Sequence, residues 1–229
     1  MIGIISAMEL EIETLRNDLK SAKQELCGID TFWTGELYGR SAVLAVCGVG
    51  KVNAALTAQQ MILRYHPEWI LNLGVAGAGD EEVGIGDLVI ATCAVQHDLD
   101  YGSLGDARGY LSRLEGVQIP CSDELRGQLL LAAQKVPGLR AVEGLIATGD
   151  QFVDREALRQ DIHGAFGCKA VEMEGGAIAF ACWAHGVPCG IVRSISDGAN
   201  QHSGMDFPTF AKMAAGHAQQ VVQHLLMED

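Results

Sequence analysis

The sequence predicts an α/β fold, a three-layer α/β/α sandwich in which helices cover both faces of a mixed central sheet. Short apolar runs rich in Val and Ile recur along the 229 residues, and longer stretches with helical spacing lie between most of them. Such alternation is typical of a sheet buried between helices. No linker rich in Pro or Gly divides the chain, so we expect residues 1–229 to form a single domain.

The apolar runs have the length of strands and lack a strict alternation with polar residues. This pattern indicates strands that are covered on both faces. The predicted strands lie at residues 2–5, 41–46, 69–75, 87–95, 142–149, 169–173 and 189–196.

The helical stretches carry apolar residues three and four positions apart. The predicted helices lie at residues 8–19, 51–65, 122–134, 154–162, 174–185 and 207–227. In the last of them Met213, Ala214 and Val221 fall near one face, which we expect to pack on the sheet. The least regular segment, residues 97–118, is long for an ordered loop. Such loops are usually functional, so we expect a lid or a contact to a partner subunit.

Composition and charge limit the classes of partner. Hydrophobic residues make up 48% of the chain, and a domain of this size buries roughly 70–75% of the surface of its unfolded chain, so its core needs no metal or cofactor. The 29 acidic and 16 basic residues give a net charge of −13. Phosphate backbones and anionic lipids are repelled by such a charge, so we expect no nucleic-acid and no membrane partner.

The chain shows no signal for export. No apolar run approaches the ~20 residues that span a bilayer, and no basic segment precedes an apolar stretch at the N-terminus. The 7 cysteines show no CxxC spacing, which favours reduced thiols over disulfides or structural zinc. We therefore expect a soluble protein of the cytoplasm.

Glycines gather at the predicted carboxyl ends of strands, where open α/β sheets bind ligands. They lie in the segments GVG (48–50), GVAGAG (74–79), TGD (148–150) and SDG (196–198). Glycine at such a position lets a ligand approach the backbone closely.

Familiar cofactor motifs do not fit these segments. The GVGKVNA segment lacks the third glycine of a dinucleotide fingerprint, and GAGD at 77–80 has no following Lys-Ser/Thr pair of a phosphate loop. His97, Asp98 and Asp100 resemble a metal cluster but lack a further His or Cys at ligand spacing. We expect no cofactor and no metal.

Carboxylates stand close to the same strand ends. Glu9, Glu11 and Glu13 open a helix, and because a helix turns by about 100° per residue, at most two of them face a crevice. Glu172 and Glu174 end an apolar strand, where an ionised carboxylate needs a partner such as a pair of vicinal hydroxyls. Asp197 in RSISDG also ends a predicted strand. An aspartate at such a turn is either a helix cap or a catalytic group.

Taken together, the motifs resemble one enzyme family. The segments are GIISAMELEIE (3–13), GVGKVNAA (48–55), GVAG (74–77), GLIATGDQFV (144–153), AVEMEGGAIA (170–179) and RSISDGAN (193–200). In order and spacing they resemble the 5′-methylthioadenosine/S-adenosylhomocysteine nucleosidases of the nucleoside phosphorylase superfamily. The resemblance implies a nucleoside phosphorylase-like fold, a homodimer, and hydrolysis of methylthioadenosine, S-adenosylhomocysteine and 5′-deoxyadenosine to adenine and the sugar.

The same resemblance assigns the chemistry. Asp197 matches the acid that protonates purine N7, and Glu11 matches the carboxylate that directs water at the anomeric carbon. Glu174 matches the acceptor of hydrogen bonds from the ribose hydroxyls, and Met173 lies beside the sugar. Arg193 resembles a buried arginine that holds the network of carboxylates and water.

The remaining matches concern the walls of the site. Phe152 would stack on the purine, the Val153 backbone would bind its edge, and Ser196 would lie close by. The apolar pocket for the 5′-alkylthio group would be lined by Met8, Val49 and Phe207. The chain departs from many relatives at Val75, where a serine is expected, and in the segment 97–118, which in the family lies near the dimer interface.

Three rival functions remain at this point. A purine nucleoside phosphorylase needs cations for phosphate, yet residues 1–15 hold three glutamates and no Lys or Arg, and a glutamate at the nucleophile site repels phosphate. A hydrolase of futalosine or aminodeoxyfutalosine would use the same carboxylates. A nucleoside-binding protein without activity would not require Glu11, Glu174 and Asp197 together.

Overall fold

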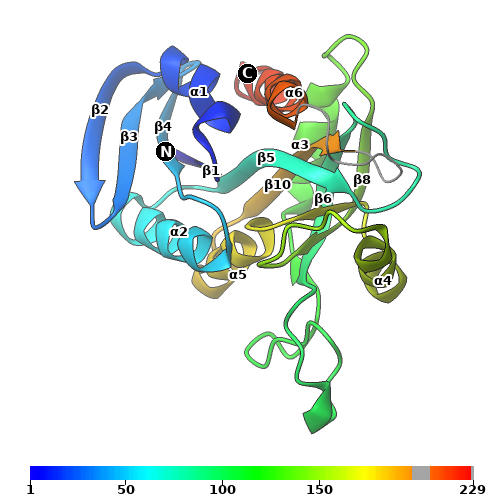
Figure 1. Cartoon of the computed structure of the whole chain (residues 1–229). Coiled ribbons are helices and arrows are strands. Elements are labelled where there is room, and N and C mark those ends of the chain that lie inside the picture. Colours follow the sequence, from blue (N-terminus) through cyan, green and yellow to red (C-terminus); the bar gives the residue numbers. More distant parts are fainter. Residues whose placement is uncertain (198–206, 228–229) are drawn as a thin grey trace.

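The computed structural model describes residues 1–197 and 207–227, and for Asp197 and residues 207–212 it describes the backbone alone. Figure 1 shows a twisted sheet with helices on both sides. The strands are β1 (Ile2–Ser6), β2 (Lys20–Cys27), β3 (Asp30–Leu37), β4 (Arg40–Val46), β5 (Ile70–Ala78), β6 (Leu88–Gln96), β7 (Ile119–Pro120), β8 (Ala141–Thr148), β9 (Ala170–Glu172) and β10 (Cys189–Asp197). The helices are α1 (Glu9–Asp18), α2 (Lys51–Tyr65), α3 (Asp123–Ala133), α4 (Glu156–Phe166), α5 (Gly175–His185) and α6 (Phe207–Leu226), with a 3₁₀ turn η1 (Gly102–Leu104).

The sheet is mixed, as predicted, and part of it closes on itself. Its strand order is β10-β6-β8-β9-β5-β1-β4-β3-β2, and an additional pairing joins β10 to β5. Strands β4, β1, β5 and β10 run parallel to one another, whereas β6 is antiparallel to β10 and β9 is antiparallel to β5. The parallel strands bring their carboxyl ends to one edge of the sheet.

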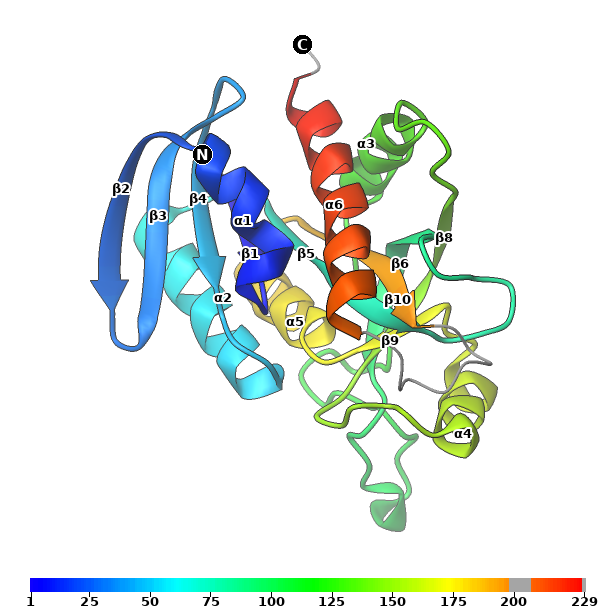
Figure 2. The ribbon, with the colours of Figure 1, turned by 45° about the horizontal axis from the view of Figure 1, so that its top comes forward.

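Helices cover both faces of the sheet. Helices α2 and α5 pack together on one face, and α6 packs against α1 and α3 on the other, an arrangement that Figure 2 also shows. On β1 the side chain of Ile5 belongs to the core on the α2 side, while those of Ile2 and Ile4 belong to the core on the α6 side. The prediction of burial on both faces is therefore confirmed for β1, whereas β8 is buried only over residues 145–148.

The predicted helices are all present, with small shifts at their ends. Helix α4 continues to Phe166, four residues beyond the predicted end, and stops where Gly167 adopts a left-handed backbone with φ of 66°. Helix α3 begins where the Ser122 hydroxyl accepts a hydrogen bond from the Leu125 amide at 3.3 Å.

The sequence did not predict the hairpin of β2 and β3. Strand β2 reads KSAKQELC and is exposed along nearly its whole length, so it carries no apolar pattern. It is the edge strand of the sheet and pairs with β3 alone.

The irregular segment 97–118 projects from the body of the molecule after β6 (Figure 1). It contains η1 and an isolated bridge between Leu111 and Gly116. All seven cysteines are free thiols. None of the helices in the described residues is long and apolar enough to span a membrane.

Candidate active site

Glu11 lies in the first turn of α1, and its carboxylate folds back onto the end of β1. Oε2 accepts hydrogen bonds from the backbone amides of Ala7 (3.0 Å) and Met8 (2.8 Å), and Oε1 accepts one from Val75 on β5 (2.9 Å). The side chain is almost completely buried. Burial raises the pKa of Glu11 above its usual value, although the charge of Arg193 and the three amides act in the opposite direction.

The other two glutamates of this helix point elsewhere. Glu9 and Glu13 are exposed, and Glu9 forms an ion pair with Arg16 on the surface. Only one of the three carboxylates therefore faces the interior, as the helical rotation predicts.

Arg193 lies on β10, behind the wall of the site. Its guanidinium is buried and donates to the side chains of Glu172 and Asn72, and to the Asn72 and Val192 carbonyls at 3.3 and 3.1 Å. An arginine in such a position is held charged by the carboxylates around it, which raise its pKa against the effect of burial. Its contact with Glu172 is the most buried ion pair among the described residues.

Both carboxylate oxygens of Glu172 accept hydrogen bonds from other groups of the protein. Besides Arg193 it receives hydrogen bonds from the Thr148 hydroxyl and from the amides of Glu174 (3.0 Å) and Gly175 (2.7 Å) at the start of α5. Helix N-termini favour negative charge at this position. The partner that this strand-end carboxylate needs is therefore supplied by the protein itself.

Glu174, two residues later, is different. Its Oε1 accepts one hydrogen bond, from the Gly50 amide at 2.9 Å, and the side chain faces a cavity. Burial raises the pKa of Glu174 to about 7, with a further contribution from the neighbouring charge of Glu172. The carboxyl group keeps hydrogen-bonding capacity for a ligand.

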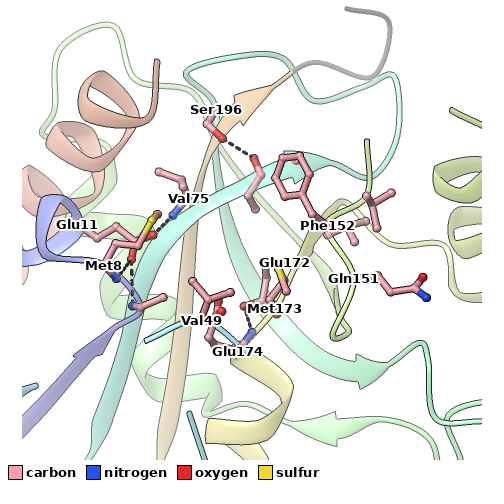
Figure 3. Close-up of a pocket in the computed structure, with 15 residues that line it drawn as sticks. Met8, Glu11, Val49, Val75, Gln151, Phe152, Glu172, Met173, Glu174 and Ser196 are labelled. Carbon is pink, nitrogen blue, oxygen red and sulfur yellow. Dashed lines mark hydrogen bonds between the residues drawn. The ribbon is translucent and has the colours of Figure 1, made fainter. Parts of the chain in front are cut away.

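The strand ends enclose a cavity of about 210 Å³. Glu11 and Met8 lie at one end and Phe152 at the other, with Val49, Met173 and Glu174 along one side (Figure 3). The residues that line it are Ala7, Met8, Glu11, Val49, Val75, Ala76, Gly77, Gln151, Phe152, Val153, Val171, Glu172, Met173, Glu174 and Ser196. Its lining is mostly apolar, with carboxylates as the charged groups among the described residues.

Most of the residues that the sequence singled out meet at this cavity. Arg193 does not line it but contacts Glu172 behind it. Ser196 lies near the end of β10 with its Oγ 3.4 Å from the Ala76 carbonyl. The backbone of Asp197 pairs with Gly77 after an irregularity in β10, but its side chain and that of Phe207 lie outside the described residues. Their roles stay predictions.

The sequence reading missed several residues of the site. Asn72 is a lone amide in the apolar run 69–75, and Thr148 is a lone hydroxyl at the end of β8. Both bind the Glu172–Arg193 pair directly. The signal that could have identified them is a polar side chain within a strand that is otherwise apolar.

The polar residues at the start of segment 97–118 are engaged within the protein. The Asp98 carboxylate binds Lys51, and Asp100 accepts a hydrogen bond from the Gly102 amide at 2.8 Å. Within residues 1–197 and 207–227, no group of three or more His, Cys, Asp or Glu side chains has the arrangement of a metal site.

Comparison with known proteins places the chain among relatives of similar length. The profile of the phosphorylase superfamily matches residues 1–227. The 5′-methylthioadenosine/S-adenosylhomocysteine nucleosidase of Staphylococcus aureus is 37% identical over 229 residues, which is 100% of both chains.

Solved structures agree with this match. The 5′-methylthioadenosine/S-adenosylhomocysteine nucleosidase of Neisseria meningitidis, in complex with methylthio-immucillin-A, has a TM-score of 0.94 and 34% identity over 99% of this chain and 98% of that one. A futalosine hydrolase mutant of Helicobacter pylori has a TM-score of 0.92 and 31% identity, with 98% and 97% covered. The chain therefore belongs to the phosphorylase superfamily and, within it, to the family of the 5′-methylthioadenosine/S-adenosylhomocysteine nucleosidases.

Proposed function

We propose that the protein is an enzyme that hydrolyses the N-glycosidic bond of 5′-methylthioadenosine and S-adenosylhomocysteine, and also of 5′-deoxyadenosine. The products are adenine and the sugar, which carries the thioether in the first two cases. The observation that carries the proposal is the buried Glu11 carboxylate, held by three backbone amides at one end of an apolar cavity whose other end holds Phe152.

Glu11 is the proposed base. A water molecule attacks the anomeric carbon, Glu11 takes one of its protons, and the bond between sugar and adenine breaks with its electron pair going to the purine. The raised pKa of Glu11 improves it as a proton acceptor near neutral pH. The amides fix the direction of its remaining lone pairs, so the water is oriented before the reaction.

Asp197 is the proposed acid at purine N7, so that adenine leaves as a neutral base. A positioned general acid contributes typically about 10²–10⁴-fold to the rate. Glu174 is the proposed acceptor for the 2′- and 3′-hydroxyls, with Met173 beside the sugar. We assign Phe152, Val153 and Ser196 to the purine, and Met8, Val49 and Phe207 to the 5′ substituent, with Val75 close to the sugar and the water.

Water is favoured over phosphate as the nucleophile by the charge of the cavity. Among the described residues that line it, Glu11, Glu172 and Glu174 are the charged side chains, and Arg193 is already held by Glu172. A phosphate ion would meet like charges without a cation to bind it. This supports hydrolysis over phosphorolysis.

Hydrolysis of aminodeoxyfutalosine or futalosine is the second candidate, because the futalosine hydrolase of Helicobacter pylori is almost as similar in structure. The same carboxylates would serve, and the pocket for the 5′ substituent would decide between substrates. A non-catalytic nucleoside-binding protein would have no use for a buried carboxylate with a raised pKa beside the sugar.

We also propose that the protein is a homodimer of the cytoplasm. Val52, Leu56 and Leu63 lie four and seven residues apart on α2, and each exposes about half or more of its surface. An apolar stripe of this kind suits an interface between two copies. The buried thiols of Cys47, Cys168, Cys182 and Cys189 suit a reducing compartment.

The function is tested by adenine release from a panel of nucleosides without phosphate. The panel holds methylthioadenosine, S-adenosylhomocysteine, 5′-deoxyadenosine, aminodeoxyfutalosine and inosine. We expect fast release from the first two, and an Asp197→Asn variant that folds but loses most of this activity. A requirement for phosphate, a preference for inosine, or a fully active Asp197→Asn variant would contradict the proposal.

A further inference from the structure

Three charged residues form a closed ring beside the cavity. Lys51 Nζ lies 2.6 Å from Asp98 Oδ1, the Asp150 amide donates to Asp98 Oδ2 at 2.8 Å, and the Lys51 amide donates to Asp150 Oδ1 at 2.8 Å. The Lys51 ammonium is also 3.3 Å from the Gln96 amide oxygen and 4.0 Å from the second Asp150 oxygen. None of the three side chains in the ring lines the cavity described above.

The ring is partly shielded from water. The side chains of Lys51 and Asp98 are 17% and 21% exposed, whereas that of Asp150 is 48% exposed. Burial alone would raise the pKa of Asp98, but the hydrogen bonds from Lys51 and from the Asp150 amide bring it below its usual value, so Asp98 is ionised at neutral pH. Shielded ion pairs are less weakened by salt than pairs on the open surface.

The ring joins two segments that each form part of the cavity wall. One is residues 48–50, where Val49 lines the cavity and the Gly50 amide binds Glu174. The other is residues 149–153, where Phe152 and Val153 line the cavity. Asp98, two residues after the end of β6, binds both segments.

Both segments contain glycine. Gly48 and Gly50 have φ of 80° and 98°, a backbone region that costs other residues energy. At Gly149 a Cβ would lie 2.2 Å from Nε2 of the buried His97, so this segment rests directly on the imidazole ring. Each segment is also held by one backbone hydrogen bond to another part of the protein, from the Gly48 amide to the Ala7 carbonyl and from the Gly149 amide to the Glu172 carbonyl, each at 3.1 Å. The ring adds direct contacts between the two segments.

We propose that Lys51, Asp98 and Asp150 form a positioning clamp, which holds the Gly50 amide at Glu174 and the Phe152 segment across from it. The clamp acts through Gly50 and not by contact with the substrate. Its effect is to set how strongly the enzyme recognises the sugar hydroxyls. The inference rests on the sugar-binding role proposed for Glu174.

The test combines enzyme variants with a substrate that lacks one hydroxyl. The ratio of kcat/KM for 5′-methylthioadenosine to that for its 3′-deoxy analogue measures recognition of the hydroxyl. Asp98→Asn places an amide group between two donors, and Lys51→Met keeps the aliphatic stem without the charge. Arg64→Met is the matched control. Arg64 lies in the last turn of α2, at the opposite end of the helix from Lys51, and forms an ion pair with Glu25.

We expect the ratio to be high in the wild type and to fall about 10-fold in Asp98→Asn and in Lys51→Met, since a misplaced hydrogen bond to a carboxylate loses about that factor. Arg64→Met leaves the ratio unchanged. The two variants break the ring at different atoms, so the proposal can be tested with either variant if the other does not fold.

An equal loss on both substrates would mean that the ring only supports the structure, and the proposal would be overturned. A failure of the proposed function looks different. In that case the wild type itself shows no preference for the hydroxyl, and Glu174→Gln changes nothing.

Discussion

Gly74 lets the Glu11 carboxylate reach the backbone of β5. A Cβ at position 74 would lie 2.7 Å from Glu11 Oε1 and 3.4 Å from Arg193 Nη1. The first distance is shorter than any ordinary contact, so a side chain there would displace the carboxylate from the Val75 amide. The first glycine of GVAG, Gly74, therefore makes room for the protein's own carboxylate, whereas the sequence alone indicated close approach by a ligand.

Gly74→Ala should lower kcat by about 10²-fold, because a displacement of roughly 1 Å of a catalytic group is enough for such a loss. Steady-state kinetics with methylthioadenosine measure the effect. Gly127→Ala in α3 is the control, since a Cβ there meets nothing within 4 Å and alanine is the better helix former. Unchanged kcat in Gly74→Ala would show that the position of Glu11 does not matter.

Glu11→Gln should fold and lose at least about 10²-fold in kcat, because the amide cannot take a proton from water. Both oxygens of Glu11 accept hydrogen bonds from backbone amides, so the NH2 group of the glutamine would face an N–H donor. We therefore expect a modest loss of stability, of about 1–3 kcal/mol. Glu9→Gln on the exposed side of the same helix is the control. If both variants kept full activity, another group would have to be the base.

The strands with apolar runs could be predicted from the sequence, because burial on both faces favours apolar residues along most of a strand. Strand β2 could not, since its side chains face water along nearly its whole length and only its pairing with β3 makes it a strand. The glycines at strand ends indicated the edge of the sheet at which the cavity lies.

The different hydrogen-bond partners of Glu172 and Glu174 could not be predicted from residues 170–176 alone. Glu172 is the last residue of β9 and Glu174 directly precedes α5, and what distinguishes the two carboxylates comes from elsewhere in the chain. Glu172 meets Arg193 from β10 and Thr148 from β8, whereas Glu174 meets the Gly50 amide. These pairings depend on strand order, which local patterns do not contain.

The Glu172–Arg193 ion pair should be costly to break. Arg193→Met would leave Glu172 buried without its cation, and loss of one partner of a buried pair typically costs about 3–5 kcal/mol. Urea unfolding measures the free energy of unfolding, and Arg16→Met, which breaks an exposed pair with Glu9, should cost less than about 1 kcal/mol. Equal losses in the two variants would mean that burial of the pair has no effect.

The stability of the protein should fall as the pH rises toward neutral because of Glu174. Its pKa is raised from 4.5 to about 7 in the folded protein, so between these values the folded state binds the proton more tightly than the unfolded chain. The unfolded state loses its proton first, and the free energy of unfolding decreases over this range. Urea unfolding at pH 5 and pH 7.5 should show a smaller decrease in Glu174→Gln, which cannot ionise, than in the wild type. The same decrease in both proteins would exclude Glu174 as its source.

The apolar stripe of α2 should hold the proposed dimer together. Leu56 lies in the middle of this stripe and is 49% exposed, so Leu56→Glu would place a charge, and by two-fold symmetry a pair of like charges, in the interface. We expect light scattering to give twice the chain mass of 24.4 kDa for the wild type and the single mass for this variant. Leu131→Glu is the matched control, because Leu131 is 56% exposed on α3, across the sheet from α2. A dimer that survives Leu56→Glu but not Leu131→Glu would place the interface on the opposite face of the molecule.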